Sequence, residues 1–126
     1  MSQSDEPPIG AIVWRDLTVA DADAIRRFYC DVVGWISAPH DMGGYHDFDI
    51  RDVSGQTVAG ICHARGDNAS LPAQWLIYIR VADVEASAQR CTALGGDILD
   101  GPRMMGSNRF CVIRDPAGAV TALIEA

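Results

Sequence analysis

Two stretches of the chain show the apolar pattern of β-strands, and each is followed by a segment with helical spacing. The strand-like runs extend from Ile12 to Val19 and from Trp75 to Val81, and they are rich in the residues that strands favour. The helical segments place apolar residues three or four positions apart, as an amphipathic helix on a core does. These residues are Ile25, Phe28, Tyr29, Val32 and Val33 in the first segment, and Val84, Ala88, Cys91 and Leu94 in the second. The pattern predicts a strand and then a helix, twice.

The ends of both helices are marked by residues that cap helices. Asp21 and Asp83 directly precede the helical segments, and an aspartate there accepts hydrogen bonds from the first backbone amides of a helix. Gly34 and the pair Gly95–Gly96 follow the segments, and glycine adopts the left-handed conformation that closes a helix.

Three shorter strands are predicted after each helix. They cover residues 35–37, 45–51 and 57–63 in the first half, and residues 97–99, 109–113 and 119–124 in the second. Turns at Asp52–Gly55 and Asp115–Gly118 join the last two strands of each half, because Asp, Pro and Gly favour tight turns. Each half is therefore predicted to be a βαβββ unit.

The two halves also resemble each other in sequence. Val19–Asp23 recurs as Val81–Glu85 62 residues later, and Ile50–Asp52 recurs as Ile113–Asp115 63 residues later. Such internal similarity indicates a duplicated structural unit. We predict one α+β domain over residues 9–126, made of module one (9–72) and module two (73–126), after a flexible N-terminal tail (1–8).

Composition narrows the possible partners. The chain has 126 residues, 48% of them hydrophobic, and a formal net charge of -7, which disfavours nucleic acid and anionic membrane surfaces. It has no apolar run of the ~20 residues that a membrane span needs, and its first residues are polar. We expect a cytoplasmic protein with free, buried thiols rather than disulfides. The thiols are those of Cys30, Cys62, Cys91 and Cys111.

The order of elements and several local motifs resemble the vicinal oxygen chelate superfamily, which includes glyoxalase I, bleomycin resistance proteins and extradiol dioxygenases. The motifs are Trp14–Val19, Phe28–Tyr29, Gly34–Trp35 and Asp115–Gly118. They look like the subgroup of predicted enzymes related to lactoylglutathione lyase. The resemblance implies two modules that form a cupped mixed β-sheet with outer helices, a small-molecule ligand inside the cup, and a homodimer.

The resemblance also implies where a metal would bind. Metal-dependent members carry ligands at positions that match Trp14, Leu76, Ala122, and either Ala59 or Gly60 of this chain. None of these side chains offers the imidazole, carboxylate or thiolate that a divalent metal needs. We therefore expect neither the family metal nor another cofactor, and no metal-dependent glyoxalase or dioxygenase activity.

A metal site at other positions remains an alternative. It would have to gather the three histidines with a nearby carboxylate. The residues concerned are His40, His46 and His63, with Asp41 or Asp47.

Alternation along the first strand of each module suggests which side chains share the inner face. It places Asp16 and Thr18 with Trp14, and Tyr78 and Arg80 with Leu76. These groups would hold a polar ligand over Trp14, or Asp16 and Arg80 would form an internal ion pair while Tyr78 fills space. The candidate ligand-binding residues are Trp14, Thr18, Leu76, Arg80, Met105 and Ala122.

Two functions are compatible with these residues. The first is a metal-free protein that binds a small, partly apolar or aromatic molecule. The second is a lyase or isomerase acting on a small carbonyl or thiol-adduct metabolite, with His63, Tyr78 and Asp16 as candidate acid/base residues or with a recruited metal. The position of His63 depends on register, because it faces the cup if Ala59 does and faces away if Gly60 does.

Overall fold

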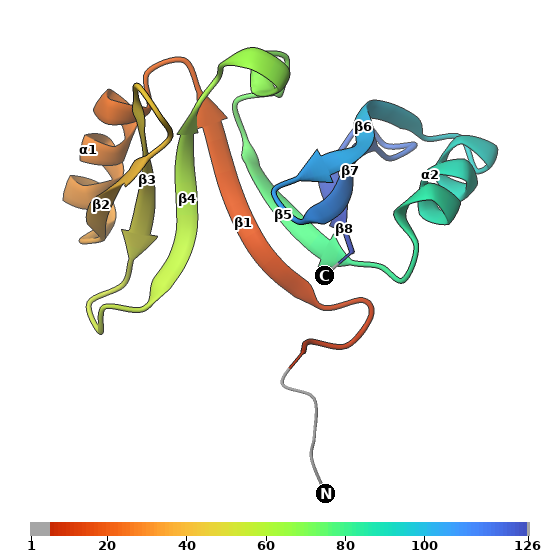
Figure 1. Ribbon diagram of the computed structural model, residues 1–126, viewed down its shortest axis with the longest axis horizontal. Helices are drawn as coiled ribbons and strands as arrows, with labels where there is room; N and C mark the ends of the chain where they lie inside the picture. The colour runs from red at the N-terminus through yellow and green to blue at the C-terminus, as the bar shows by residue number, and fades with distance from the viewer. Residues whose placement is uncertain (1–5, 126) are drawn as a thin grey trace, which may run out of the picture. The chain divides into compact units, whose positions relative to one another are not determined.

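Residues 6–125 are described by the computed structural model, and they form the βαβββ order twice (Figure 1). The chain divides into two units: Trp14–Trp75, and the described residues on either side of that segment. The predicted α+β class and the duplicated βαβββ order are confirmed. Neither described helix is long and apolar enough to cross a membrane.

The first βαβββ half is a four-stranded sheet with one helix. Its strands lie in the order β2-β3-β4-β1, with β1 and β4 parallel and the other neighbours antiparallel. Its elements are β1 (Ile12–Val19), α1 (Ala22–Val33), β2 (Ile36–Asp41), β3 (His46–Arg51) and β4 (Thr57–His63).

Helix α1 begins and ends where the sequence predicts. The Asp21 carboxylate accepts a hydrogen bond from the amide of Ala24 at 3.0 Å, and Gly34 closes the helix with φ of 84°. Ile25 and Tyr29 of α1 pack against a buried cluster of sheet residues that includes Leu17. The apolar stripe of α1 therefore covers one face of the sheet, as amphipathic spacing requires.

The second βαβββ half repeats this arrangement. Its strands lie in the order β5-β8-β7-β6, with β5 and β8 parallel and the other neighbours antiparallel. Its elements are β5 (Trp75–Arg80), α2 (Val84–Ala93), β6 (Asp97–Met105), β7 (Asn108–Arg114) and β8 (Val120–Ile124).

Helix α2 covers its own sheet in the same way. Asp83 accepts a hydrogen bond from the Ala86 amide at 3.1 Å. Val84 and Ala88 of α2 form a buried cluster with Cys111 and Leu123 of the sheet. The four cysteines of the chain are free thiols, as predicted, but only Cys111 is buried, while Cys30, Cys62 and Cys91 are partly exposed.

Equivalent aspartate turns join the last two strands of each half. The amide of Gly55 bonds to the Asp52 carbonyl at 3.0 Å, and the amide of Gly118 bonds to the Asp115 carbonyl at 2.9 Å. Each aspartate carboxylate also accepts two or more backbone amides of its own turn. Both predicted turns are therefore confirmed.

The structure extends some predicted elements and adds one. Strand β6 continues from Asp97 to Met105 instead of ending at residue 99, with register shifts on either side of Asp100. Those shifts let the strand continue through Gly101, whose φ is 82°, and through Pro102, which an edge strand tolerates. A short 3-10 helix, η1 (Gly66–Asn68), follows β4 and was not predicted.

Part of the predicted N-terminal tail contacts Arg80. The Arg80 guanidinium donates to the Glu6 carboxylate at 3.1 Å and to the Pro7 carbonyl. The backbone of Arg80 also bonds to Gly10 and Ala11, each at 2.8 Å. Residues 1–5 of the predicted tail lie outside the described residues.

Candidate functional site

The sheet of the Trp14–Trp75 unit has two chemically different faces. Leu17 and Ile61 lie on the face that packs against α1. On the opposite face, a Cβ built on Gly60 would lie 2.5 Å from the Asp16 Oδ1 and 3.7 Å from the Trp14 ring. Gly60 therefore shares the face of Trp14 and Asp16. We call this surface the Trp14 face. Because side chains alternate between the two faces of a strand, it also includes the side chains of Thr18, Asp47, Asp49 and Cys62.

Trp14 is held in place on this face by a hydrogen bond. Its indole Nε1–H donates to the Asp16 Oδ1 at 2.6 Å, within one strand and two residues apart. Charge-assisted bonds of this kind are short and strong. Because Gly60 has no side chain, the carboxylate and the indole lie directly against the backbone of β4. The pair therefore forms a fixed aromatic and polar surface.

Three carboxylates of the Trp14 face influence the thiol of Cys62. Burial raises the pKa of Cys62 far above its usual range, and the negative charges of Asp16, Asp47 and Asp49 raise it further. The mostly buried Asp47 also accepts the backbone amide of His63 at 2.9 Å. This face therefore carries a neutral thiol among acidic groups.

His63 lies on the opposite face from Asp16. Its Nδ1 is 3.5 Å from the amide of Ala22 and 3.5 Å from the carbonyl of Ala20, at the start of α1. Its ring packs edge-on against Tyr45, with ring centroids 6.0 Å apart. Of the two registers considered for β4, the structure has the one in which Gly60 shares the Trp14 face. His63 and Asp16 are therefore separated by the sheet.

The predicted site residues of the second unit are mostly buried. Leu76 and Tyr78 are 1% and 3% exposed, and Ala122 is fully buried. Tyr78 pairs with Ala122 in the parallel β5–β8 ladder, while their neighbours Ile79 and Leu123 pack beneath α2. These residues therefore occupy the face of their sheet that points away from α2.

Arg80 and Met105 lie at the ends of their strands. Arg80 ends β5, where its guanidinium binds the Glu6 and Pro7 groups described above. Met105 ends β6, is half-buried, and pairs with Asn108 across the β6–β7 hairpin.

The residues at the positions where the resemblance implies metal ligands do not fit a metal. An indole at Trp14, a hydrogen at Gly60, an isobutyl group at Leu76 and a methyl group at Ala122 supply no ligand atom of the required kind. Within residues 6–125, no group of three or more His, Cys, Asp or Glu side chains is arranged to hold a metal ion.

The alternative histidine site is not assembled either. The ring of His40 contacts the Asp49 carboxylate at 3.5 Å, and β2–β3 pairing places it on the face of Asp47. His63 is on the other face of the sheet. Alternation along β3 places His46 on the same face as His63. His40 therefore does not share a surface with the other two histidines.

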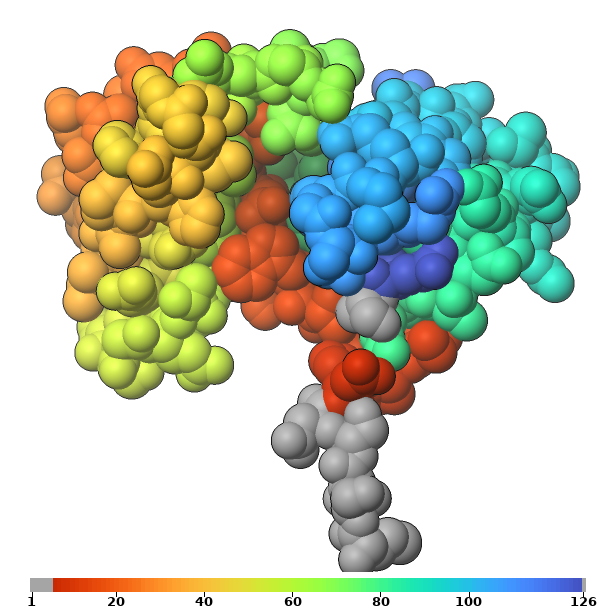
Figure 2. Space-filling model, viewed as in Figure 1, coloured from red at the N-terminus to blue at the C-terminus, as the bar shows by residue number. Residues whose placement is uncertain are grey.

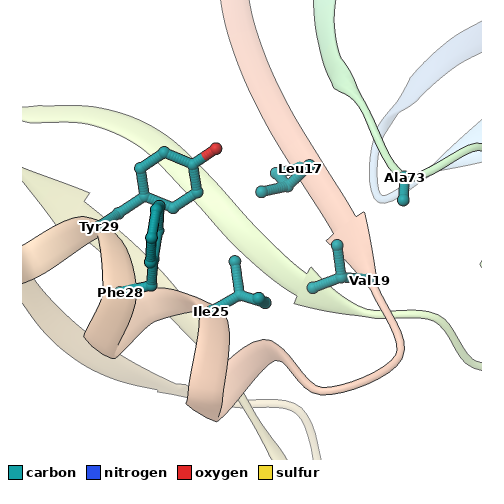
Figure 3. Close-up of a pocket in the computed structure, with 6 residues that line it drawn as sticks. All are labelled: Leu17, Val19, Ile25, Phe28, Tyr29 and Ala73. Carbon is teal, nitrogen blue, oxygen red and sulfur yellow. The ribbon is translucent and has the colours of Figure 1, made fainter. Parts of the chain in front are cut away.

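One feature of the α1 side was missed by the sequence analysis. An apolar pocket of about 260 Å³ lies between α1, β1 and the segment before β5 (Figure 3). The helical spacing placed the α1 residues in the core, but no sequence signal showed that Ala73 would complete a cavity with them. The lining residues are Leu17, Val19, Ile25, Phe28, Tyr29 and Ala73.

Comparison with known proteins adds information on relatives. A family model described as a glyoxalase-like domain matches residues 12–124. The anthracycline biosynthesis protein DauV of Streptomyces sp. strain C5 is 30% identical over 131 residues, covering 90% of this chain and 46% of DauV. The chain thus spans about half the length of the curated relatives it matches.

Solved structures with the same fold include two from bacteria. A glyoxalase/bleomycin resistance protein/dioxygenase superfamily member from Vibrio splendidus 12B01 matches with a TM-score of 0.58 at 13% identity, covering 90% of this chain and 97% of that one. Methylmalonyl-CoA epimerase from Mycobacterium tuberculosis matches with a TM-score of 0.53 at 20% identity, covering 88% and 84%. At these identities the likeness establishes a shared fold.

Proposed function

The chain belongs to the glyoxalase-like domain family, and we propose that it binds a small, partly aromatic molecule on the Trp14 face without the family's metal. One observation carries the proposal. The Trp14 indole is fixed by Asp16 beside a glycine, so an aromatic plane and bare backbone adjoin each other. A rigid aromatic surface binds a planar ligand at low entropic cost.

The charges on this face favour a particular kind of ligand. Asp16, Asp47 and Asp49 all lie close enough to Cys62 to raise its pKa. Their field attracts a cationic group and repels an anionic one. We therefore propose a neutral or cationic ligand rather than an anionic one.

The name of a relative supports an aromatic ligand. DauV is named for anthracycline biosynthesis, and anthracyclines contain fused aromatic rings. We propose that the ligand of this chain likewise contains an aromatic ring system. Leu76, Arg80, Met105 and Ala122 stay predicted ligand contacts.

The proposal assigns no step to a metal. The groups at the family's metal positions offer no ligand atoms, so metal-dependent lyase or dioxygenase chemistry has no support in these side chains. An acid/base pair of His63 with Asp16 is not supported either, because the two lie on opposite faces of the sheet.

The tryptophan side chains of the protein allow the proposal to be tested by NMR. The indole Nε1–H signals of Trp14, Trp35 and Trp75 can be followed by NMR and assigned with Trp→Phe variants. We expect 2-naphthylmethylamine, a cation at pH 7, to shift the Trp14 signal. 2-Naphthoate has the same ring and a negative charge, and we expect it to bind about ten-fold more weakly.

The control is Trp14→Ala, in which the probes should no longer shift the backbone amide signals of Asp16 and Gly60, while the Trp35 and Trp75 signals stay in place. If the Trp14 signal moves with neither probe, or if both probes bind Trp14→Ala as tightly as the parent, the proposed function is wrong.

We further propose that the chain forms a homodimer. Val32, Val33 and Ile36 are apolar and at least half exposed at the end of α1 and the start of β2. We call these residues the Val32 patch. Helix α1, in orange in Figure 2, lies at the surface of its unit. Contiguous exposed apolar residues favour association with another protein surface.

A further inference from the structure

The apolar pocket beside α1 lies on the opposite side of the sheet from the Trp14 face. Leu17 and Val19 of β1 form one wall, and residues of α1 form the facing wall (Figure 3). Ala73, from the segment before β5, lies on the far side of β1 from the helix in this view. Ala73 and Phe28 are both exposed, Phe28 to 55%. The pocket is therefore open to solvent while its interior is apolar.

The aromatic wall of the pocket is rigid. The rings of Phe28 and Tyr29 meet at 90° with centroids 5.2 Å apart. Tyr29 also packs edge-on against Trp75, at 5.4 Å and 79°. The Trp75 Nε1–H donates to the Tyr29 hydroxyl at 3.1 Å. These contacts fix the plane of the Tyr29 ring from two sides.

The Tyr29 hydroxyl retains a proton to donate. Its oxygen already accepts from Trp75, and among the described residues it has no other hydrogen-bond partner. A tyrosine hydroxyl both donates and accepts. In Figure 3 the hydroxyl oxygen is directed to the side of the ring nearest Leu17. The pocket therefore combines apolar walls with one available hydrogen-bond donor.

The size and polarity of the pocket define the ligand class. An apolar cavity of about 150 Å³ is large enough to hold benzene, and this pocket has about 260 Å³. That volume suits one ring or two fused rings. No charged side chain lines it, so an ion would lose its hydration without compensation.

We propose that this pocket is a second ligand site, distinct from the Trp14 face, that binds a neutral planar aromatic molecule of one or two rings. A carbonyl or other acceptor on the ligand takes the hydrogen bond from the Tyr29 hydroxyl. The ligand covers the exposed ring of Phe28 and the side chain of Val19.

The test uses two probes of nearly equal shape. 1-Acetonaphthone carries a carbonyl, and 1-ethylnaphthalene does not. We expect both to shift the Trp75 indole signal and the amide signals of Phe28 and Ala73, with the ketone binding about five-fold more tightly, as one neutral hydrogen bond predicts. In Trp14→Ala the shifts of the Phe28, Ala73 and Trp75 signals should be unchanged, which separates this site from the proposed function.

Two variants test the location and the hydrogen bond. Ala73→Phe fills the pocket from an exposed segment and should abolish binding of both probes. Tyr29→Phe should remove the advantage of the ketone, read from the Phe28 and Ala73 amides, and leave the hydrocarbon affinity unchanged.

Three outcomes would overturn the proposal. The first is no shift of these signals with either probe up to its solubility limit. The second is unchanged binding to Ala73→Phe, which would place the probes elsewhere. The third is an equal loss for both probes in Tyr29→Phe, which would make the hydroxyl a structural group only.

Discussion

Gly60 makes room for the Asp16 side chain on the Trp14 face. Its missing side chain leaves space for the Asp16 carboxylate, which a Cβ would approach to 2.5 Å. That carboxylate is also the acceptor for Trp14. The geometry of the proposed binding surface therefore depends on a residue that contributes no functional group.

Gly60→Ala should disturb this arrangement. The new methyl group would displace the Asp16 carboxylate and weaken its bond to Trp14, so we expect a loss of about 1 kcal/mol in the free energy of unfolding. Urea denaturation measures the loss, and the Trp14 indole NMR signal reports the bond.

The Asp16→Ala background provides the matched control. There the clash is absent and alanine is better than glycine in a strand, so Gly60→Ala should be neutral or stabilising. The same loss in both backgrounds would show that the clash with Asp16 is not the cause.

The thiols of Cys62 and Cys111 lead to a second prediction about single residues. Burial raises the pKa of Cys111 to about 11 from a usual value near 9, so its reactive thiolate is scarce at pH 8. We expect Cys62 and Cys111 to react with Ellman's reagent only after unfolding, as mapped by mass spectrometry. Rapid labelling of either thiol in the native protein would contradict this.

The same pKa difference makes stability depend on pH. Between about pH 9 and pH 11 the Cys111 thiol is ionised in the unfolded chain but still protonated in the folded one. The unfolded state then binds fewer protons, so the free energy of unfolding falls as the pH rises. Urea titrations at pH 8.5 and 10.5 should show a smaller fall for Cys111→Ala than for the parent, and equal falls would contradict the assignment.

Single side chains were predicted less well than the strands that carry them. Alternation correctly placed Trp14, Asp16 and Gly60 on one face only once the register of β4 was known. A shift of one residue moves His63 to the other face, and the sequence near Ala59 and Gly60 is compatible with both registers. The apolar pocket depends on where the chain returns near Ala73, which no local pattern encodes.

At the scale of elements, the two halves use the same devices at equivalent positions. Asp21 and Asp83 each accept an amide three residues later, at 3.0 and 3.1 Å. The turns at Asp52 and Asp115 likewise share their backbone bonds. These local devices have strong sequence preferences, which explains why the helices and turns could be predicted.

Asp21→Ala and Asp83→Ala should therefore have similar effects. Each removes one N-cap hydrogen bond and should lower the free energy of unfolding by about 1 kcal/mol. Thermal and urea denaturation would measure both, and Asn at either position should restore most of the loss because it also caps helices. A loss far above this range at one position only would indicate a role for that carboxylate beyond capping.

Strand β6 shows where local signals mislead. The sequence pattern predicts that this strand ends at residue 99, before Gly101 and Pro102, yet the strand continues past them to Met105. A Cβ at Gly101 would lie 2.7 Å from the Phe110 carbonyl, so this glycine serves a close approach to β7 instead of a turn. Pairing with a neighbouring strand overrides local preference here.

At the scale of the whole molecule, the chain has the family's fold, while the positions at which the resemblance predicts metal ligands carry none. The family model matches residues 12–124, but the matching positions carry side chains such as those of Trp14 and Leu76. Fold and chemistry are thus independent properties of this chain. The aromatic and acidic groups of the Trp14 face are features of this sequence and are the basis for assigning a ligand class.

The Val32 patch leads to the last prediction. Val32 is 65% exposed on α1, and a glutamate there would place a charge among the apolar side chains of Val33 and Ile36. If two copies associate through this patch, burying the charge is costly, so Val32→Glu should convert a dimer into a monomer of 13.6 kDa. Sedimentation velocity measures the change.

Leu94→Glu, at a 77% exposed position near the end of α2, is the matched control and should remain dimeric. A monomeric parent, or a dimeric Val32→Glu, would rule out association through this patch.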